Sequence, residues 1–261
     1  MMRIENYHTH TYRCQHAKGT DREYILQAID QDFDVLGFAD HTPWPDTEKL
    51  AGDNSRMRMS QLEEYISTMN SLKEEFAGKI DLCIGLECEP FKDYFHWLED
   101  TKGRYNIEYL IIGNHYANDK PGEIFIGKEF DPKDAGKYVK KLQCAMETGL
   151  FKYVAHPDLL FSNYQVVDDY VKSVSRDICQ LSKDTGVALE YNLSGIWKRQ
   201  DNYYQGLGYP CEAFWEIAST YDPDVFVGFD AHVPSKLQKK MFVDNAEKLV
   251  GMGIRVLNYT R

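Results

Sequence analysis

The sequence predicts a single domain of the α/β class, and three observations support this. Short apolar runs recur along the 261 residues, and each is followed by polar turn residues and a longer helical pattern, as in βα units. No linker, repeat or low-complexity tract interrupts the alternation. Imidazole and carboxylate side chains stand at the ends of the apolar runs, where α/β barrels assemble their active sites. We therefore expect a barrel, with an open doubly wound sheet as the main alternative.

The predicted strands are short and apolar. Seven are expected, and the pattern leaves an eighth open at residues 254–259. The seven span residues 4–10, 34–40, 81–89, 109–116, 152–158, 187–193 and 225–232.

Helical windows separate these strands. The first begins at Asp21, with Thr20 as its N-cap, and the second opens with Ser60 and Glu63 at the spacing of a capping box. The segment 91–100, which contains His96, is interpreted as a lid. Four later windows cover residues 131–149, 167–186, 211–220 and 239–253.

Composition limits the classes of function. The net charge of −11 and the pI near 5.2 argue against a general affinity for nucleic acid or anionic membranes. No apolar run approaches the roughly 20 residues that span a bilayer, and the first residues lack the apolar core of a signal peptide. The six cysteines form no CxxC pair, so we expect reduced, mostly buried thiols and a cytoplasmic location.

Most of the eight histidines fall at one kind of position. Six of them lie at or just beyond the C-terminal ends of five predicted strands: His8, His10, His41, His115, His156 and His232. Two carboxylates, Glu87 and Asp230, also end very apolar strands, where burial is costly unless the charge is paired or bound to a cation. This combination favours a site for zinc, iron or manganese over a hydrogen-bonded network without metal.

Taken in order, the motifs resemble the PHP (polymerase and histidinol phosphatase) superfamily, and within it the histidinol-phosphate phosphatase branch. The resemblance is carried by "HTHT" at 8–11, "CQHAKGT" with His16, "GFADHTP" with His41, "GLECE" with Glu87, "IGNHY" with His115, "AHPD" with His156 and "FDAH" with Asp230 and His232. It implies a distorted (β/α)7 barrel, one PHP-type metal-dependent phosphoesterase domain over residues 1–261, and three divalent metal ions.

The resemblance also implies a set of ligands for each metal. The first metal takes His8, His10, Glu87 and Asp230; the second takes Glu87, His115 and His156; the third takes His16, His41 and His232. Glu87 bridges the first two metals in this scheme. All nine positions carry side chains that can ligate a metal.

The implied reaction is hydrolysis of a phosphomonoester by a hydroxide that bridges two metals. The leading substrate is L-histidinol phosphate, a small metabolite of histidine biosynthesis. Catalytic roles then fall to Glu87 and Asp230, with Asp230 or a metal-bound water as the proton donor to the leaving group.

A non-metal phosphate clamp is expected after the sixth strand. Arg199 is the first choice because its planar fork can donate two hydrogen bonds to one phosphate, and Lys198 is the second. The alternative is that residues 197–199 form a solvated loop. Arg13 and Lys18 are further candidates that bracket His16.

Departures from the family pattern affect details of the site. Phe229 stands where a serine is common, and Gly113 and Asn114 precede His115. No basic residue follows His156 before Lys172, which weakens the case for histidinol phosphate specifically.

Two other functions remain open. A PHP phosphodiesterase or exonuclease would act on nucleotides or short oligonucleotides, since the acidity of the chain counts only against long nucleic acids. A metal-binding regulatory module would keep the ligands without the activity. The sequence indicates no oligomeric state.

Overall fold

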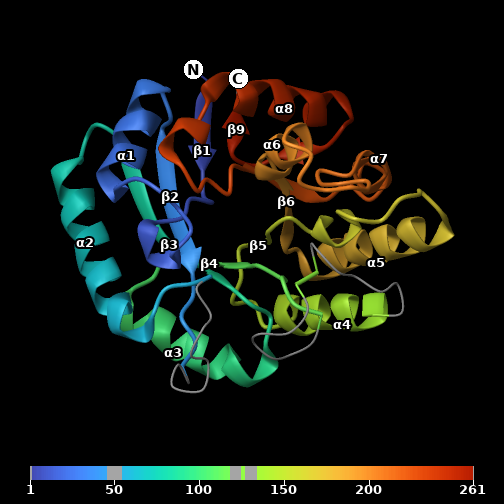
Figure 1. The fold of residues 1–261 in the computed structure, drawn as a ribbon, viewed down its shortest axis with the longest axis horizontal. Coiled ribbons are helices and arrows are strands. Elements are labelled where there is room, and N and C mark those ends of the chain that lie inside the picture. The colour runs from blue at the N-terminus through green and yellow to red at the C-terminus, as the bar shows by residue number, and fades with distance from the viewer. Residues whose placement is uncertain (1, 46–54, 118–124, 127–133, 261) are drawn as a thin grey trace.

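Seven parallel strands form the centre of the molecule and lie side by side in sequence order (Figure 1). The computed structural model describes residues 2–45, 55–117, 125–126 and 134–260. The strands are β1 (Arg3–Asn6), β2 (Val35–His41), β3 (Asp81–Cys88), β4 (Tyr109–Ile112), β5 (Tyr153–Val154), β6 (Ala188–Asn192) and β7 (Asp224–Gly228). All seven predicted strands are therefore confirmed.

Two short strands extend the sheet at its two edges. β8 (Arg255–Val256) pairs with β7 in parallel, and β9 (Tyr259–Thr260) pairs with β1 in the antiparallel direction. Beyond the ends of β1 and β7, Thr9 and Ala231 form a further parallel bridge. The barrel prediction is confirmed by the nearly closed sheet, and the open doubly wound alternative is excluded because this bridge links the segments that follow β1 and β7.

Asn258 is the side chain at this closure. It is buried, and its Oδ1 accepts a hydrogen bond of 2.9 Å from the N–H of Val227 in β7. Its Nδ2 donates to the carbonyl oxygens of Glu5 in β1, at 2.6 Å, and of Val227, at 2.7 Å. One amide group thus satisfies backbone groups of both strands that meet at the seam.

Helices surround the strands on the outside of the barrel (Figure 1). They are α1 (Asp21–Asp30), α2 (Leu62–Glu75), α3 (Phe95–Tyr105), α4 (Ala135–Met146), α5 (Asp169–Thr185), α6 (Ser194–Gln200), α7 (Glu212–Ala218) and α8 (Lys239–Gly251). The longer helices bury apolar residues at helical spacing; α5, for example, buries Val171, Val174 and Ile178. No helix in the described ranges is long and apolar enough to cross a membrane.

One of the two predicted caps is confirmed. Thr20 accepts from the N–H of Glu23, and the Glu23 carboxylate accepts from the N–H of Thr20, which is a capping box. The box predicted for Ser60 and Glu63 is wrong, because Met59–Gln61 forms a 3-10 turn before α2. In that turn the side chain of Gln61 accepts from the N–H of Arg58 instead.

Two segments are more helical than the sequence indicated. The segment 91–100, interpreted as a lid, contains the 3-10 turn Lys92–Tyr94 and the start of α3, which buries Leu98 and Thr101. Residues 197–199, for which a solvated loop was the alternative, belong to the short helix α6. The predicted helix over 131–149 is α4, and its first three residues, 131–133, lie outside the described residues.

Aromatic side chains fill the interior of the barrel below the strand ends. Tyr109, Tyr153 and Phe226 are buried there together, and the rings of Tyr153 and Phe226 stack with centroids 4.9 Å apart. The Tyr109 hydroxyl donates to the carbonyl oxygens of Tyr7, at 2.8 Å, and Phe38, at 3.1 Å. This layer forms a rigid floor beneath the C-terminal ends of the strands.

We predict that Asn258→Ala lowers the free energy of unfolding by about 2–4 kcal/mol, because it leaves buried backbone groups of β1 and β7 without partners. Urea unfolding measures the effect. Leu257→Ala, at a neighbouring residue that is 40% exposed, is the matched control and should change stability little. Equal stabilities of the two variants would contradict the role of Asn258.

Candidate metal centre

Seven histidines and two acids converge at the C-terminal ends of the strands. His41 and Glu87 belong to β2 and β3, and the others lie in the segments that follow strands. His8 and His10 follow β1, His16 follows the turn Tyr12–Cys14, His115 follows β4, His156 follows β5, and Asp230 and His232 follow β7. Parallel strands bring these ends to one rim, so the predicted cluster is assembled by the barrel itself.

The carboxylate of Glu87 lies at the middle of the cluster and is 1% exposed. Burial raises the pKa of a carboxyl, but the imidazoles of His41, His115 and His8 hold the pKa of Glu87 well below its usual range. One carboxylate thus contacts five imidazoles. Its Oε2 lies 2.8 Å from His41 Nδ1 and 3.5 Å from both His8 Nε2 and His10 Nε2. Its Oε1 lies 3.0 Å from His156 Nε2 and 3.5 Å from His115 Nε2.

Asp230 adds a second buried carboxylate. Its Oδ1 lies 3.0 Å from His10 Nε2, 3.7 Å from His8 Nε2 and 3.3 Å from His232 Nδ1. Burial opposes its charge, but His8 and His232 hold the pKa of Asp230 well below its usual range. Its backbone has a φ of 48°, and that of His156 has a φ of 32°, in the left-handed region that non-glycine residues rarely adopt. Such backbone strain is typical of functional sites.

Three imidazoles on one side of the cluster have lowered pKa values. Burial, together with the imidazole of His10, lowers the pKa of His16, and burial lowers the pKa values of His41 and His232 well below the ordinary value. The rings of His16 and His232 stack with centroids 4.5 Å apart, and those of His16 and His41 lie 5.4 Å apart. His232 Nε2 is buried and has no hydrogen-bond partner among the described residues. A neutral imidazole nitrogen without a partner is ready to ligate a cation.

The spacing of the donor atoms fits divalent metals. Zinc binds nitrogen and oxygen ligands at about 2.1 Å, so neighbouring ligands of a tetrahedral ion are about 3.4 Å apart. The Nε2 atoms of His8 and His10 lie 3.0 to 3.7 Å from the nearest carboxylate oxygens of Glu87 and Asp230. Donor atoms of His41, Glu87 and His115 also lie close enough to share an ion, as do those of His10, His41 and His232. The nine residues therefore fit a centre of several metals.

Three further carboxylates contact the Nδ1 atoms of histidines in the cluster, and they were not predicted from the sequence. Glu190 Oε1 lies 2.8 Å from His8 Nδ1, Glu89 Oε1 lies 2.7 Å from His115 Nδ1, and Asp40 Oδ1 lies 3.4 Å from His10 Nδ1. Carboxylates in this position fix the ring orientation and raise the basicity of a metal-binding imidazole. A signal was present: Asp40 and Glu190 lie within apolar strands, as Glu87 does, and Glu89 directly follows one.

Glu190 reaches His8 because Gly228 leaves space for it. A Cβ at Gly228 would lie 1.9 Å from Glu190 Oε1, so any side chain there displaces the carboxylate. The other oxygen, Oε2, accepts hydrogen bonds from the His156 N–H and the Asn192 amide. One buried carboxylate on β6 therefore links His8 to the backbone at His156.

Gly113 makes room for Glu87 in a similar way. A Cβ there would lie 2.4 Å from Glu87 Oε1. The unusual Phe229 is buried, and its ring stacks on Trp197 with centroids 6.0 Å apart. Both departures from the family pattern thus shape the surroundings of the cluster without removing a donor.

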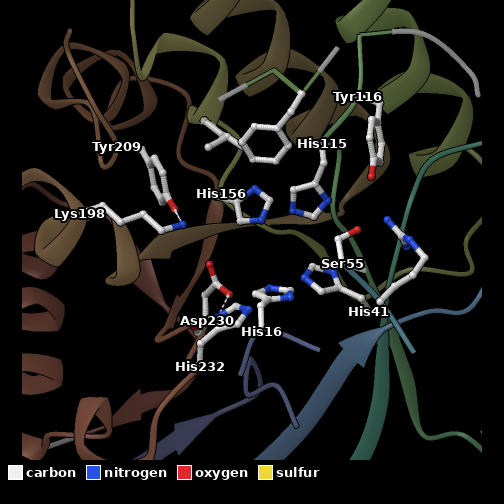
Figure 2. A pocket seen from close by; sticks show the side chains of 13 residues that line it. His16, His41, Ser55, His115, Tyr116, His156, Lys198, Tyr209, Asp230 and His232 are labelled. Atoms are coloured by element: carbon white, nitrogen blue, oxygen red, sulfur yellow. Dashed lines mark hydrogen bonds and ion pairs between the residues drawn. The ribbon is translucent and has the colours of Figure 1, made fainter. Parts of the chain in front are cut away.

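Two cavities open beside the cluster. The first, of about 130 Å³, is lined by histidines of the cluster together with Ser55, Arg56, Lys198 and Tyr209. The second, of about 400 Å³, is lined by Trp197, Lys198, Asp201, Tyr203 and Lys236, among others. Figure 2 shows Lys198 and Tyr209 on one side of the first cavity and Ser55 and His41 on the other, with His156 and His16 between them.

The two predicted phosphate clamps, Arg199 and Lys198, lie differently relative to the cavities. Arg199 is exposed and lines neither cavity, because its guanidinium donates to the carbonyl oxygens of Leu207, at 3.0 Å, and Pro210, at 2.8 Å. Lys198 lines both cavities. Arg56, which the sequence analysis missed, adds a buried cation to the first cavity.

The remaining candidates point away from the cluster. The guanidinium of Arg13 is buried between Asp21 and Glu64, with contacts of 2.9 and 2.8 Å, so it braces the segment that carries His16. Lys18 is exposed and lines neither cavity. His96 is exposed on α3, and its Nε2 lies 3.7 Å from Asp100 Oδ2.

Comparison with known proteins agrees with this geometry. The model of the PHP domain family matches residues 6–194. The chain belongs to the PHP domain family. A probable histidinol-phosphatase of Deinococcus radiodurans is 28% identical over 260 residues, which cover 97% of this chain and 95% of that protein.

A solved structure has the same fold as this PHP protein. It is histidinol phosphate phosphatase of Lactococcus lactis, solved with zinc, L-histidinol and phosphate, with a TM-score of 0.74 and 15% identity. The match covers 98% of this chain and 95% of the other.

We predict that Gly228→Ala and Glu190→Gln each weaken zinc binding by about 10–100-fold, because both remove the carboxylate that orients His8. Competition with a chromophoric chelator measures the affinity. Gly251→Ala is the matched control, since no described atom lies within 4 Å of a Cβ at that position. Unchanged zinc affinity in Glu190→Gln would show that Glu190 does not support the cluster.

Proposed function

We propose that this chain is a metal-dependent phosphomonoesterase, with L-histidinol phosphate as its substrate. The observation that carries the proposal is the buried cluster around Glu87, which adjoins a cavity lined by Lys198 and Arg56. The names and ligands of the similar proteins support the choice of substrate. A PHP-type phosphoesterase domain over residues 1–261, a cytoplasmic location and a small phosphorylated metabolite as partner belong to the same proposal.

The proposal assigns the donors to three divalent ions. His8, His10, Glu87 and Asp230 would hold the first, Glu87, His115 and His156 the second, and His16, His41 and His232 the third. Zinc is supported by the similar structure solved with it, and iron or manganese suits the same nitrogen and oxygen donors. When bound, such ions lower the pKa of water toward about 7 and neutralise the charge of a phosphate.

The side chains of this chain bind and orient the substrate. Lys198 supplies positive charge to the first cavity, which in a protein of net charge −11 makes a local site for an anion, and Arg56, whose guanidinium lies 3.4 Å from the buried carboxylate of Glu89, adds N–H donors. Arg56 is fixed in place: its guanidinium lies over the Trp44 ring at 3.7 Å and donates to the Thr42 carbonyl oxygen at 3.0 Å. A cation held in this way binds a phosphate with little loss of side-chain entropy.

Glu87 and Asp230 act in this proposal by holding cations and orienting histidines. A proton-donor role for Asp230 fits poorly, because its pKa lies well below the usual range and its carboxylate stays ionised. The proton for the leaving group is better sought in another group, and a metal-bound water stays open as the alternative.

A phosphate-release screen tests the substrate class. Protein loaded separately with zinc, manganese or iron is given L-histidinol phosphate, other metabolite phosphomonoesters and nucleotides. We expect the highest kcat/KM for L-histidinol phosphate. Rapid turnover of a nucleotide with inert histidinol phosphate would replace the proposal by a nucleotide-directed phosphoesterase, and no turnover of any ester would favour a regulatory module.

We predict that His10→Ala and Glu87→Ala each lower phosphate release by at least about 100-fold with every metal, because each removes a donor from the centre. His96→Ala is the matched control: its side chain is 85% exposed on α3. Turnover by the His10 and Glu87 variants equal to that of the control would contradict a metal mechanism.

A further inference from the structure

One cationic side chain stands where the two cavities meet. Among the described residues, five line both cavities: His16, Phe125, Lys198, Asp230 and His232. Three of these are donors in the proposed metal centre, and a phenylalanine ring has no proton to transfer. Lys198 is therefore the shared side chain that carries a transferable proton and has no role in holding a metal.

The sizes of the two cavities indicate where each portion of the substrate binds. This step rests on the proposed function. Small-molecule pockets are usually about 300–1,000 Å³. The first cavity, of about 130 Å³, accommodates the phosphate against the histidine cluster, whereas the second, of about 400 Å³, has room for the alcohol portion. The ester oxygen between the two portions then lies at the junction, beside Lys198.

We propose that Lys198 is the general acid that protonates the leaving oxygen. When the bond between phosphorus and the ester oxygen breaks, the oxygen keeps the electron pair and takes a proton from the ammonium of Lys198. The product is a neutral alcohol, and the neutral amine of Lys198 then regains a proton from water. Lys198 is thus a catalytic residue and not only a source of positive charge for the phosphate.

Tyr209 positions the ammonium for this step. Lys198 Nζ donates to Tyr209 Oη at 2.8 Å, and the two side chains lie together at the edge of the first cavity (Figure 2). Tyr209 is 1% exposed, so its hydroxyl is a fixed acceptor. After proton transfer the same hydroxyl can donate to the neutral amine, which keeps Nζ in place for the next turnover.

Leaving groups of different basicity distinguish this role from phosphate binding. p-Nitrophenolate departs as a stable anion, whereas the alkoxide of L-histidinol needs a proton. We expect Lys198→Met to lower kcat for L-histidinol phosphate by about 10²–10⁴-fold, the usual contribution of a general acid. The same variant should change kcat for p-nitrophenyl phosphate far less.

Lys198→Arg separates charge from acidity. Arginine keeps the positive charge that a phosphate clamp needs but does not give up its proton in proteins. We therefore expect Lys198→Arg to retain p-nitrophenyl phosphate turnover and to lose histidinol phosphate turnover. Lys183→Met, at an exposed lysine on α5, controls for loss of a lysine and should match the wild type with both esters.

The outcomes separate this inference from the proposed function. Equal losses with both esters in Lys198→Met, or restored histidinol phosphate turnover in Lys198→Arg, would overturn the general-acid role and leave the phosphatase intact. A wild type that hydrolyses neither ester would overturn the proposed function and, with it, the inference. Thermal unfolding of each variant identifies any loss caused by misfolding.

Discussion

Burial of the Glu87 carboxylate is the constraint on which the site depends. A carboxylate cannot remain ionised inside a protein unless positive charge or donors surround it. Here five imidazoles do so, and they come from four other strand ends spread around the barrel. The charge of one residue therefore requires the strands from β1 to β5 to be in register.

The rest of the architecture serves that requirement. The seam at Asn258 brings the end of β1 next to the end of β7, and so His8 and His10 next to Asp230. The aromatic layer around Tyr109 and Tyr153 supports the cluster from below. Behind the histidines, Glu190, Asp40 and Glu89 restrict ring rotation. The donor atoms are thus preorganised to bind cations, which is the arrangement that lowers the cost of binding.

The fold and the nine donors could be predicted from sequence because both follow from local order. A polar residue at the end of a parallel strand must lie at one rim, wherever it stands in the chain, so Glu87 and His156 could be assigned to one site. The support of His8 by Glu190 depends on contacts between residues 182 positions apart and on space left by Gly228, which no local pattern encodes. Which of Lys198 and Arg199 lines the cavities could not be predicted, because neighbouring residues of a helix point about 100° apart and the sequence left a solvated loop over residues 197–199 open.

Anomalous diffraction from crystals of the protein grown with zinc tests the metal centre most directly. Three peaks are expected around Glu87: one beside His8, His10 and Asp230, one beside His115 and His156, and one among His16, His41 and His232. Both oxygens of Glu87 should contact a peak. Zinc bound only elsewhere on the protein, with none within coordination distance of Glu87, would contradict the central role of this carboxylate.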